Sequence, residues 1–145
     1  MRRAARGFGG RWRLREDGGS TAIEFVLLTP ILFVLIFSAV QYAIFFHARH
    51  VALAAAQAGA RVARASAGDP NAPWEADARD KTQAYLAQLG GNLVRLKAGG
   101  IETHREGEIV GVRVQGTAPS ILPLIDIPID VRSDGPVERF REDTG

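Results

Sequence analysis

Residues 22–46 read AIEFVLLTPILFVLIFSAVQYAIFF, and this apolar run decides the fold. After Glu24 the run holds no charge until His47 and Arg49, which follow it. An α-helix rises about 1.5 Å per residue, so the stretch 25–46 would reach about 33 Å, while the hydrocarbon core of a bilayer is about 30 Å thick. The run therefore predicts a transmembrane helix, and only the rest of the chain can form a folded domain.

A cleaved secretory signal is the competing interpretation of this run. Its apolar part would be about 7–15 residues long and would end in a cleavage site of the small-x-small type. The stretch 38–43, SAVQYA, offers only a poor version of that site. Arg2 and Arg3 could belong to a twin-arginine signal, but the neighbouring residues do not support it. We therefore keep the transmembrane interpretation.

Charge is distributed unevenly along the chain. Before residue 20, six arginines oppose two acids, which gives +4, whereas residues 20–145 hold 12 basic and 14 acidic residues, which gives −2. An excess of arginine beside a membrane span is typical of its cytoplasmic side. The N-terminus is therefore predicted to lie in the cytoplasm and the rest of the chain outside. The mildly acidic body argues against nucleic-acid binding.

The helical pattern continues after the apolar run through the alanine-rich segment 47–67, and Gly68 and Pro70 provide a stop. A helix over residues 20–67 would be about 72 Å long, more than twice the thickness of the hydrocarbon core. Small residues recur at spacing four in two neighbouring rows, Ala48, Ala52, Ala56 and Ala60, and Ala55, Gly59 and Ala63. Such rows let helix backbones approach closely. They could serve packing between subunits or packing of the helix onto its own domain, and the candidate helix-packing residues are Ala52, Ala56, Gly59 and Ala60.

A second helix is expected over residues 74–89. Its apolar residues share one face of a helix with 3.6 residues per turn. They are Trp74, Ala78, Tyr85, Leu86 and Leu89. The spacing therefore predicts an amphipathic helix that packs on the folded domain.

After residue 93 apolar residues recur at every second position, which is typical of strands. Glycines at 99–100 and 107 are expected to separate short strands, and Val110, Val112 and Val114 alternate with other residues. Ile125, Ile127, Ile129 and Val131 form a second alternating face, and Pro128 makes this an edge strand. Residues 117–124 read as a loop or crossing segment, and the tail after Asp134 is expected to be poorly ordered. The fold class is therefore α+β, with a long N-terminal helix, a second helix and a small, mostly antiparallel sheet.

Candidate chemical groups are few, and the chain has no cysteine. His47 and His50 are three residues apart on a helix and could share a metal, but no cysteine or nearby carboxylate completes a ligand set. His104 has no evident partner. Asp126, Asp130 and Asp134 recur at spacing four, which in a strand places them on the solvent face. The sequence therefore predicts no catalytic, cofactor or metal site, and we expect a protein that is not an enzyme.

The stretch 18–25, GGSTAIEF, places Glu24 inside the first turns of the apolar helix. Charged residues at the centre of a membrane helix cost about 2.5–3.5 kcal/mol each on insertion scales, so a carboxylate here needs a reason. One explanation is a capping box, in which Thr21 is the N-cap and Glu24 returns a hydrogen bond to its N–H. That explanation leaves the basic leader and the Gly19–Ser20 pair unaccounted for.

Taken together, residues 18–63 resemble the TadE-like family, the minor pseudopilins of the tight-adherence (Tad, or Flp) type IV pilus system. The shared features occur in order: a glycine, Glu24 and Phe25 at the fifth and sixth following positions, Pro30 within the span, and the juxtamembrane ARHVALAAAQAGAR. The resemblance implies a pilin-like fold and cleavage by a prepilin peptidase between Gly19 and Ser20. Cleavage after Gly18 would be the other possible cut, but only cleavage after Gly19 makes Glu24 the fifth residue of the mature chain.

The resemblance also implies roles and partners. Glu24 would pair with the N-terminal amine of a neighbouring subunit, and Pro30 would loosen or kink the helix. The partners would be a prepilin peptidase, other pilin or pseudopilin subunits, the assembly platform and the lipid bilayer. The expected parts are a cytoplasmic leader at 1–19, a long helix at 20–67 and an extracytoplasmic α+β domain at 68–145. The protein is expected to be anchored in the plasma membrane, and incorporation in the pilus is a further option. The alternative is an unprocessed single-pass anchor whose extracytoplasmic domain binds a partner.

Overall fold

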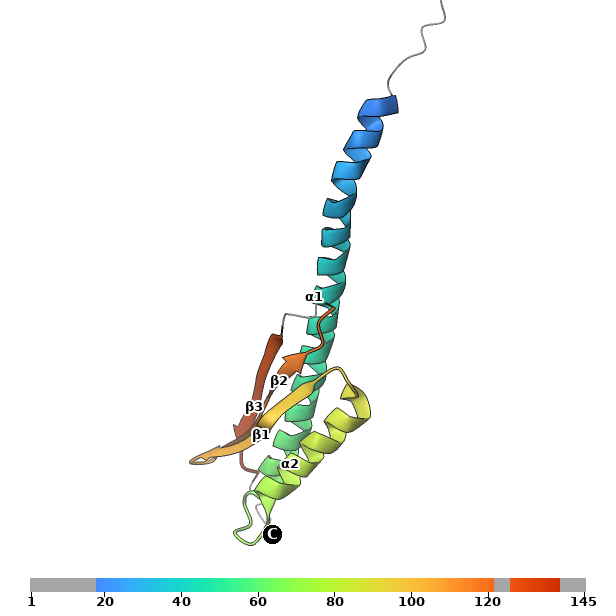
Figure 1. The fold of residues 1–145 in the computed structure, drawn as a ribbon. Helices are drawn as coiled ribbons and strands as arrows, with labels where there is room; N and C mark the ends of the chain where they lie inside the picture. The colour runs from blue at the N-terminus through green and yellow to red at the C-terminus, as the bar shows by residue number, and fades with distance from the viewer. Residues whose placement is uncertain (1–17, 122–125, 139–145) are drawn as a thin grey trace, which may run out of the picture. The chain divides into compact units, whose positions relative to one another are not determined.

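The computed structural model describes residues 18–121 and 126–138, and the side chains from residue 22 onward. It contains two α-helices, α1 (Gly18–Ser66) and α2 (Trp74–Tyr85), followed by a π-helical turn, η1 (Leu86–Gly90). Three strands complete it, β1 (Arg95–Glu106), β2 (Ile109–Ala118) and β3 (Ile127–Pro136) (Figure 1). The predicted α+β class is confirmed. Most of the predicted leader, residues 1–17, lies outside the described residues, as do residues 122–125 and 139–145.

The chain divides into two compact units, residues 1–36 and 37–145, and α1 contributes to both. The described part of the first unit, residues 18–36, is helical throughout; we call it the apolar segment. The second unit, which we call the head, contains the rest of α1, together with α2, η1 and the sheet.

Helix α1 begins at Gly18, two residues before the predicted start, so Thr21 lies inside the helix. A residue within the helix cannot be its N-cap, which has non-helical backbone angles, and the capping box at Thr21 is therefore wrong in this structure. At the other end, the Ser66 hydroxyl donates a hydrogen bond to the Val62 carbonyl at 2.8 Å. The chain then turns before Pro70, as the sequence predicted.

The three strands form an antiparallel sheet in the order β1-β2-β3. Strands β1 and β2 are joined by a tight hairpin at Gly107, whose φ of 63° requires a glycine-like backbone. The expectation that Gly99 and Gly100 end a strand is wrong, because β1 continues through them with a shift of register between Leu96 and Ile101. Gly99 has a φ of 71°, so the glycine pair forms an irregularity within one long strand.

Among the described strands, β3 pairs with β2 alone, so it lies at the edge of the sheet, as Pro128 predicted. Its side chains alternate as expected, with Ile129 and Val131 buried and Pro128 exposed. The tail was expected to lose order after Asp134, but β3 extends to Pro136, where Ile109 is its pairing partner on β2. Pairing with β2 therefore extends the strand two residues beyond Asp134.

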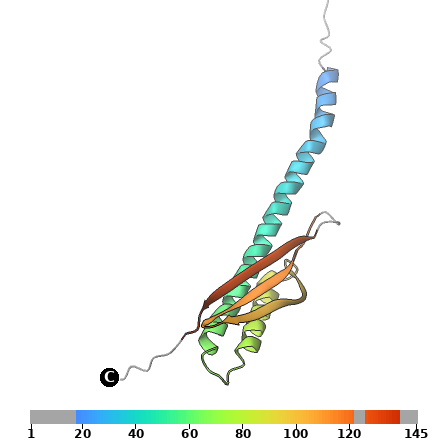
Figure 2. The same cartoon turned by 90° about the vertical axis from the view of Figure 1, so that its left-hand side faces the viewer.

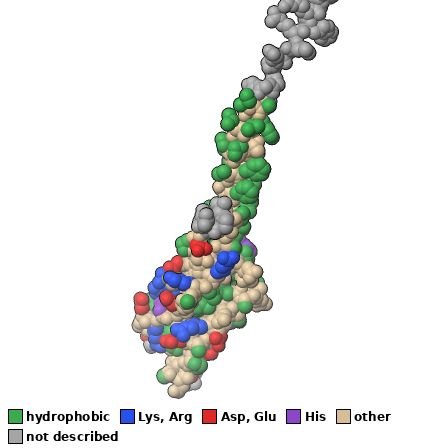
Figure 3. Space-filling model, in the orientation of Figure 1, with side chains coloured by type: hydrophobic (Ala, Val, Ile, Leu, Met, Phe, Trp, Pro, Cys, Tyr) green, Lys and Arg blue, Asp and Glu red, His purple; other side chains and the backbone are tan. Residues whose placement is uncertain are grey.

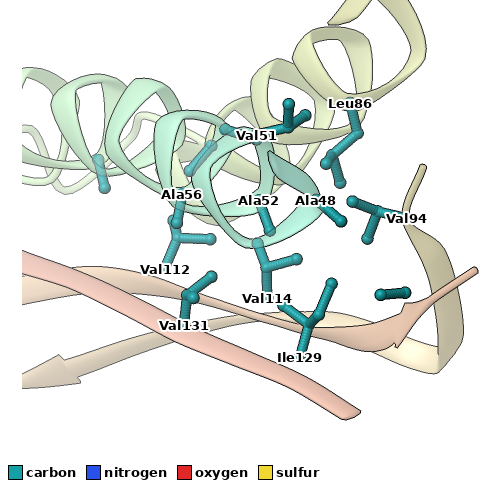
Figure 4. Close-up of a cluster of buried hydrophobic side chains, with 14 of the residues drawn as sticks. Ala48, Val51, Ala52, Ala56, Leu86, Val94, Val112, Val114, Ile129 and Val131 are labelled. Atoms are coloured by element: carbon teal, nitrogen blue, oxygen red, sulfur yellow. The ribbon is translucent and has the colours of Figure 1, made fainter. Parts of the chain in front are cut away.

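The core of the head lies between the sheet and the alanine-rich part of α1 (Figures 1 and 2). Val112 and Val114 from β2 and Val131 from β3 point toward α1, where they meet Ala52 and Ala56 (Figure 4). Small side chains on the helix let branched side chains of the strands pack directly against its backbone. Leu86 and Val94 close the core beside α2 (Figure 4).

Helix α2 uses a different face from the predicted one near its end. Ala78 and Leu86 are buried as predicted, but Leu89 is 50% exposed. The π-helical turn from Leu86 to Gly90 holds more residues per turn than an α-helix, which rotates Leu89 away from the packed face. Thr82 is buried on that face instead, and its hydroxyl donates to the Ala78 carbonyl at 2.8 Å.

Candidate functional site

The apolar segment presents its large side chains outward. From residue 22 to residue 36 every described side chain is exposed except the half-buried Thr29, and Phe25 and Leu27 are 71% and 65% exposed. Figure 3 shows a hydrophobic surface along this part of α1. Within Ala22–Ser66 the most apolar stretch has a mean hydropathy of 2.5, and none of its residues is buried in the protein. The helix is therefore long and apolar enough to cross a membrane. This surface is compatible with a single-pass membrane protein.

Glu24 and Phe25 lie on α1 among these exposed apolar side chains. Within the described residues, the Glu24 carboxylate makes no hydrogen bond and no ion pair. Gly19 and Ser20 belong to the first turn of α1 by their backbone, and their side chains lie outside the description. The predicted processing and recognition residues therefore occupy one short helical stretch at the start of the apolar segment.

Pro30 lies within α1, and the helix continues through it. Its ring nitrogen carries no hydrogen, so the Val26 carbonyl loses its usual partner four residues along the helix. One residue earlier, the Thr29 hydroxyl donates to the Phe25 carbonyl at 2.6 Å. A threonine that bonds back in this way satisfies its own hydroxyl within the helix, which suits an apolar environment.

The candidate helix-packing residues are all buried within the head: Ala52, Ala56, Gly59 and Ala60. Gly59 shows how close the approach is, because a Cβ there would lie 2.8 Å from the Ala78 carbonyl oxygen and would overlap the Thr82 hydroxyl. The small-residue rows therefore bring α1 against α2 and the sheet of the same chain. Of the two interpretations left open by the sequence, the burial supports packing of the helix onto its own domain.

Gln41 makes a long-range contact that the sequence analysis did not identify. It is a half-buried amide within the apolar run, and it joins α1 to the loop that follows β2. Its Nε2 donates to the Pro119 carbonyl at 3.1 Å, and its Oε1 accepts from the Ile121 N–H at 2.8 Å. The signal was present in the sequence, since a glutamine among phenylalanines and valines needs hydrogen-bond partners.

Charged side chains pair on the exposed face of the sheet (Figure 3). Asp130 accepts hydrogen bonds from Arg113 and, at 3.2 Å, from Gln115. The hydrogen bonds from Arg113 lower the pKa of the Asp130 carboxyl, and the same contact raises the pKa of Arg113. These are cross-strand pairs between β2 and β3, and they fit the predicted solvent face.

The other candidate groups are also placed on the surface. Asp134 lies 2.6 Å from both His104 Nε2 and Arg132 Nε, so His104 has a partner that the sequence did not reveal. His47 and His50 are exposed on α1. Among the described residues, no three His, Cys, Asp or Glu side chains lie close enough together to hold a metal ion.

The family model described as TadE-like protein matches residues 19–61. The resemblance seen in the sequence is therefore confirmed over a stretch that is less than half of the chain. This match and the exposed apolar helix fit a membrane protein related to Tad pili and associated with pilus components in general. No match is found among curated proteins or among solved structures.

Proposed function

We propose that this chain, a TadE-like protein over residues 19–61, is a minor pseudopilin or assembly component of a Tad/Flp-type pilus. The observation that carries the proposal is the coincidence of the family match with an apolar stretch of α1, residues 22–36, whose large apolar side chains are all exposed. The chain acts without catalysis, as an anchored structural subunit. Its partners are a prepilin peptidase, other pilin or pseudopilin subunits and the assembly platform.

The processing site is the bond between Gly19 and Ser20. It precedes the apolar run by only two residues, so a membrane-embedded peptidase on the cytoplasmic side could reach it. The basic leader favours that orientation, because arginine-rich flanks stay in the cytoplasm. In spheroplasts, added protease would then digest the chain after His47 and leave the leader intact; digestion of the leader would reverse the orientation.

Glu24 supplies the contact for assembly. After cleavage the free amine of Ser20 belongs to one subunit, and the Glu24 carboxylate of the next subunit is its partner. A charged group in a low-dielectric environment is costly alone, and an opposite charge offsets much of that cost. The exposed position of Glu24 among apolar side chains supports this role, since the carboxylate is open to a neighbour on the same surface that faces lipid.

The substitution Glu24→Gln tests the role of the charge. Glutamine is nearly isosteric with glutamate and keeps a hydrogen-bonding side chain, but it cannot form an ion pair with an ammonium group. We expect normal membrane insertion and normal N-terminal processing, because cleavage precedes assembly, together with loss of the protein from sheared pili or from the platform. The three quantities are measured side by side in one strain.

Glu75→Gln is the matched control, because Glu75 is an exposed carboxylate on α2 of the head. This variant should insert, be processed and co-purify with pilus components like the wild type. Incorporation of Glu24→Gln at the wild-type level would eliminate the charge pair as the basis of assembly.

A further inference from the structure

Along one face of α1 the side chains are buried by the rest of the head, and this burial ends at Gln41. Side chains spaced three and four residues apart share a helix face. Along this face Ala52 and Ala48 are fully buried, Phe45 and Gln41 are half-buried, and Phe37 is 48% exposed. Among the described residues, 119–121 are therefore the last to cover this face of α1, and Gln41 is the residue that bonds to them.

Residues 119–121 lie alongside the apolar run. Gln41 is six residues before His47, the first residue after the run, so its contact with residues 119–121 lies about 9 Å from His47 along the helix, toward the N-terminus. Neither residues 37–46 nor residues 119–121 contain a charged side chain. The exposed residues next to Gln41 in the sequence and in its contact are apolar instead: Tyr42 is 65% exposed, Val40 44% and Ile121 43%.

We propose that the loop at residues 119–121 is a second membrane contact, in which Ile121 enters the interfacial layer of the lipid bilayer beside Tyr42. The proposal rests on the membrane anchoring in the proposed function. It adds that the head is docked on the lipid surface as well as tethered to the span. The partner is a phospholipid bilayer, because Val40 and Tyr42 next to Gln41 belong to the apolar run 22–46 that is proposed to enter the membrane.

The hydrogen bonds of Gln41 lower the cost of placing residues 119–121 in the interfacial layer of the bilayer. Backbone groups that lose water must find partners inside the protein, since each unsatisfied group in a lipid environment is costly. The side-chain amide of Gln41 donates to the Pro119 carbonyl through Nε2 and accepts from the Ile121 N–H through Oε1. The Ser120 hydroxyl also donates to Gln41 Oε1, at 3.4 Å. The Gln41 side chain thus provides hydrogen-bond partners for the backbone of residues 119 and 121, and its own amide is paired at the same time. Tyr42 fits the same layer, because tyrosine is enriched at membrane–water interfaces.

Depth-dependent fluorescence quenching tests the docking. In a full-length protein with Trp12 and Trp74 replaced by phenylalanine, Ile121→Trp is compared with Ile109→Trp in phosphatidylethanolamine–phosphatidylglycerol vesicles. Ile109 is the matched control because it is 47% exposed and lies at the opposite end of β2. Lipids brominated near the carbonyl end of the acyl chain should remove most of the fluorescence of the Ile121→Trp protein and leave the Ile109→Trp protein unchanged.

A second pair of variants tests the role of Gln41 as a positioning residue. Gln41→Leu in the Ile121→Trp background keeps the helix and its apolar character but removes both backbone contacts of the loop. We expect quenching at position 121 to fall, whereas Gln57→Leu, at an exposed glutamine of the same helix, should leave it unchanged.

The outcomes separate this inference from the function on which it rests. Equal quenching at both positions, or none at position 121 in vesicle-integrated protein, would overturn loop docking alone. Protein that fails to float with the vesicles would overturn the membrane anchoring as well. Quenching at position 121 in a protein that cells leave uncleaved would support the docking and count against the pseudopilin assignment.

Discussion

The apolar segment of α1 and the alanine-rich part of the same helix differ in which side chains they bury. In the apolar segment large side chains such as Phe25 and Leu27 are exposed, whereas in the head Ala48 and Ala52 are fully buried. In water the large apolar side chains would be the ones to bury, because the hydrophobic effect grows with the area removed from solvent. The comparison teaches that the two halves have different surroundings: lipid suits the first, and the second packs against its own domain.

The largest expected effect comes from changing the surface of the apolar segment. Leu32→Lys together with Leu35→Lys should cost roughly 5–7 kcal/mol of insertion free energy and sharply lower the carbonate-resistant membrane fraction. The control is Leu89→Lys with Leu96→Lys, at two leucines of the head that are also exposed. Equal loss from the membrane in both pairs of variants would contradict the account, because the exposed leucines of the apolar segment would then matter no more for membrane insertion than those of the head.

The next effect comes from enlarging the smallest residue of the buried half. Gly59→Val would place side-chain atoms against the Ala78 carbonyl and the Thr82 hydroxyl, and overpacking of this kind costs roughly 1–3 kcal/mol. Gln57→Val, at an exposed position two residues earlier, controls for the low helix propensity of valine. Thermal unfolding in detergent, followed by circular dichroism, should show a lower midpoint for the Gly59 variant only. Identical midpoints would mean that this face of α1 is open rather than packed.

The smallest effect concerns the charged face of the sheet. Because the pKa of Asp130 is lowered in the folded protein, its ion pair stabilises the fold above the unfolded pKa of about 3.9, and this stabilisation is lost as the pH falls through the folded pKa. Asp130→Asn should lower the unfolding midpoint slightly at pH 7 and low salt, and the difference should disappear in high salt or strong acid. Asp126→Asn is the exposed control. A difference that persists in strong acid would contradict an electrostatic origin.

Much of this contrast could be read from the sequence, because each half carries a simple pattern. The absence of charge from residue 25 to residue 46 predicted the apolar segment, and the alternation at Val110, Val112 and Val114 predicted a strand with one buried face. Spacing of small residues revealed the close approach at Gly59. It could not show whether the neighbouring helix belongs to the same chain, because spacing describes a surface and not its partner.

Features that depend on long-range contacts were missed. The bulge at Gly99 depends on the register against β2, and the extension of β3 to Pro136 depends on a pairing partner at Ile109. Gln41 bonds to a loop some 80 positions later in the chain, and no local pattern indicates that contact. For the candidate site, the order of Gly19, Glu24, Phe25 and Pro30 was readable, because these residues lie within one stretch of helix.

The central claim, that the chain is a processed pseudopilin, is tested most directly by the N-terminal residue of membrane-extracted protein after co-expression with a prepilin peptidase. Intact mass and N-terminal peptide analysis give this residue. The account predicts Ser20 at the N-terminus in the wild type and in the control Gly18→Val, and a full-length chain in Gly19→Val. An intact leader in the wild-type protein, with an active peptidase present, would contradict the account and favour an unprocessed membrane anchor.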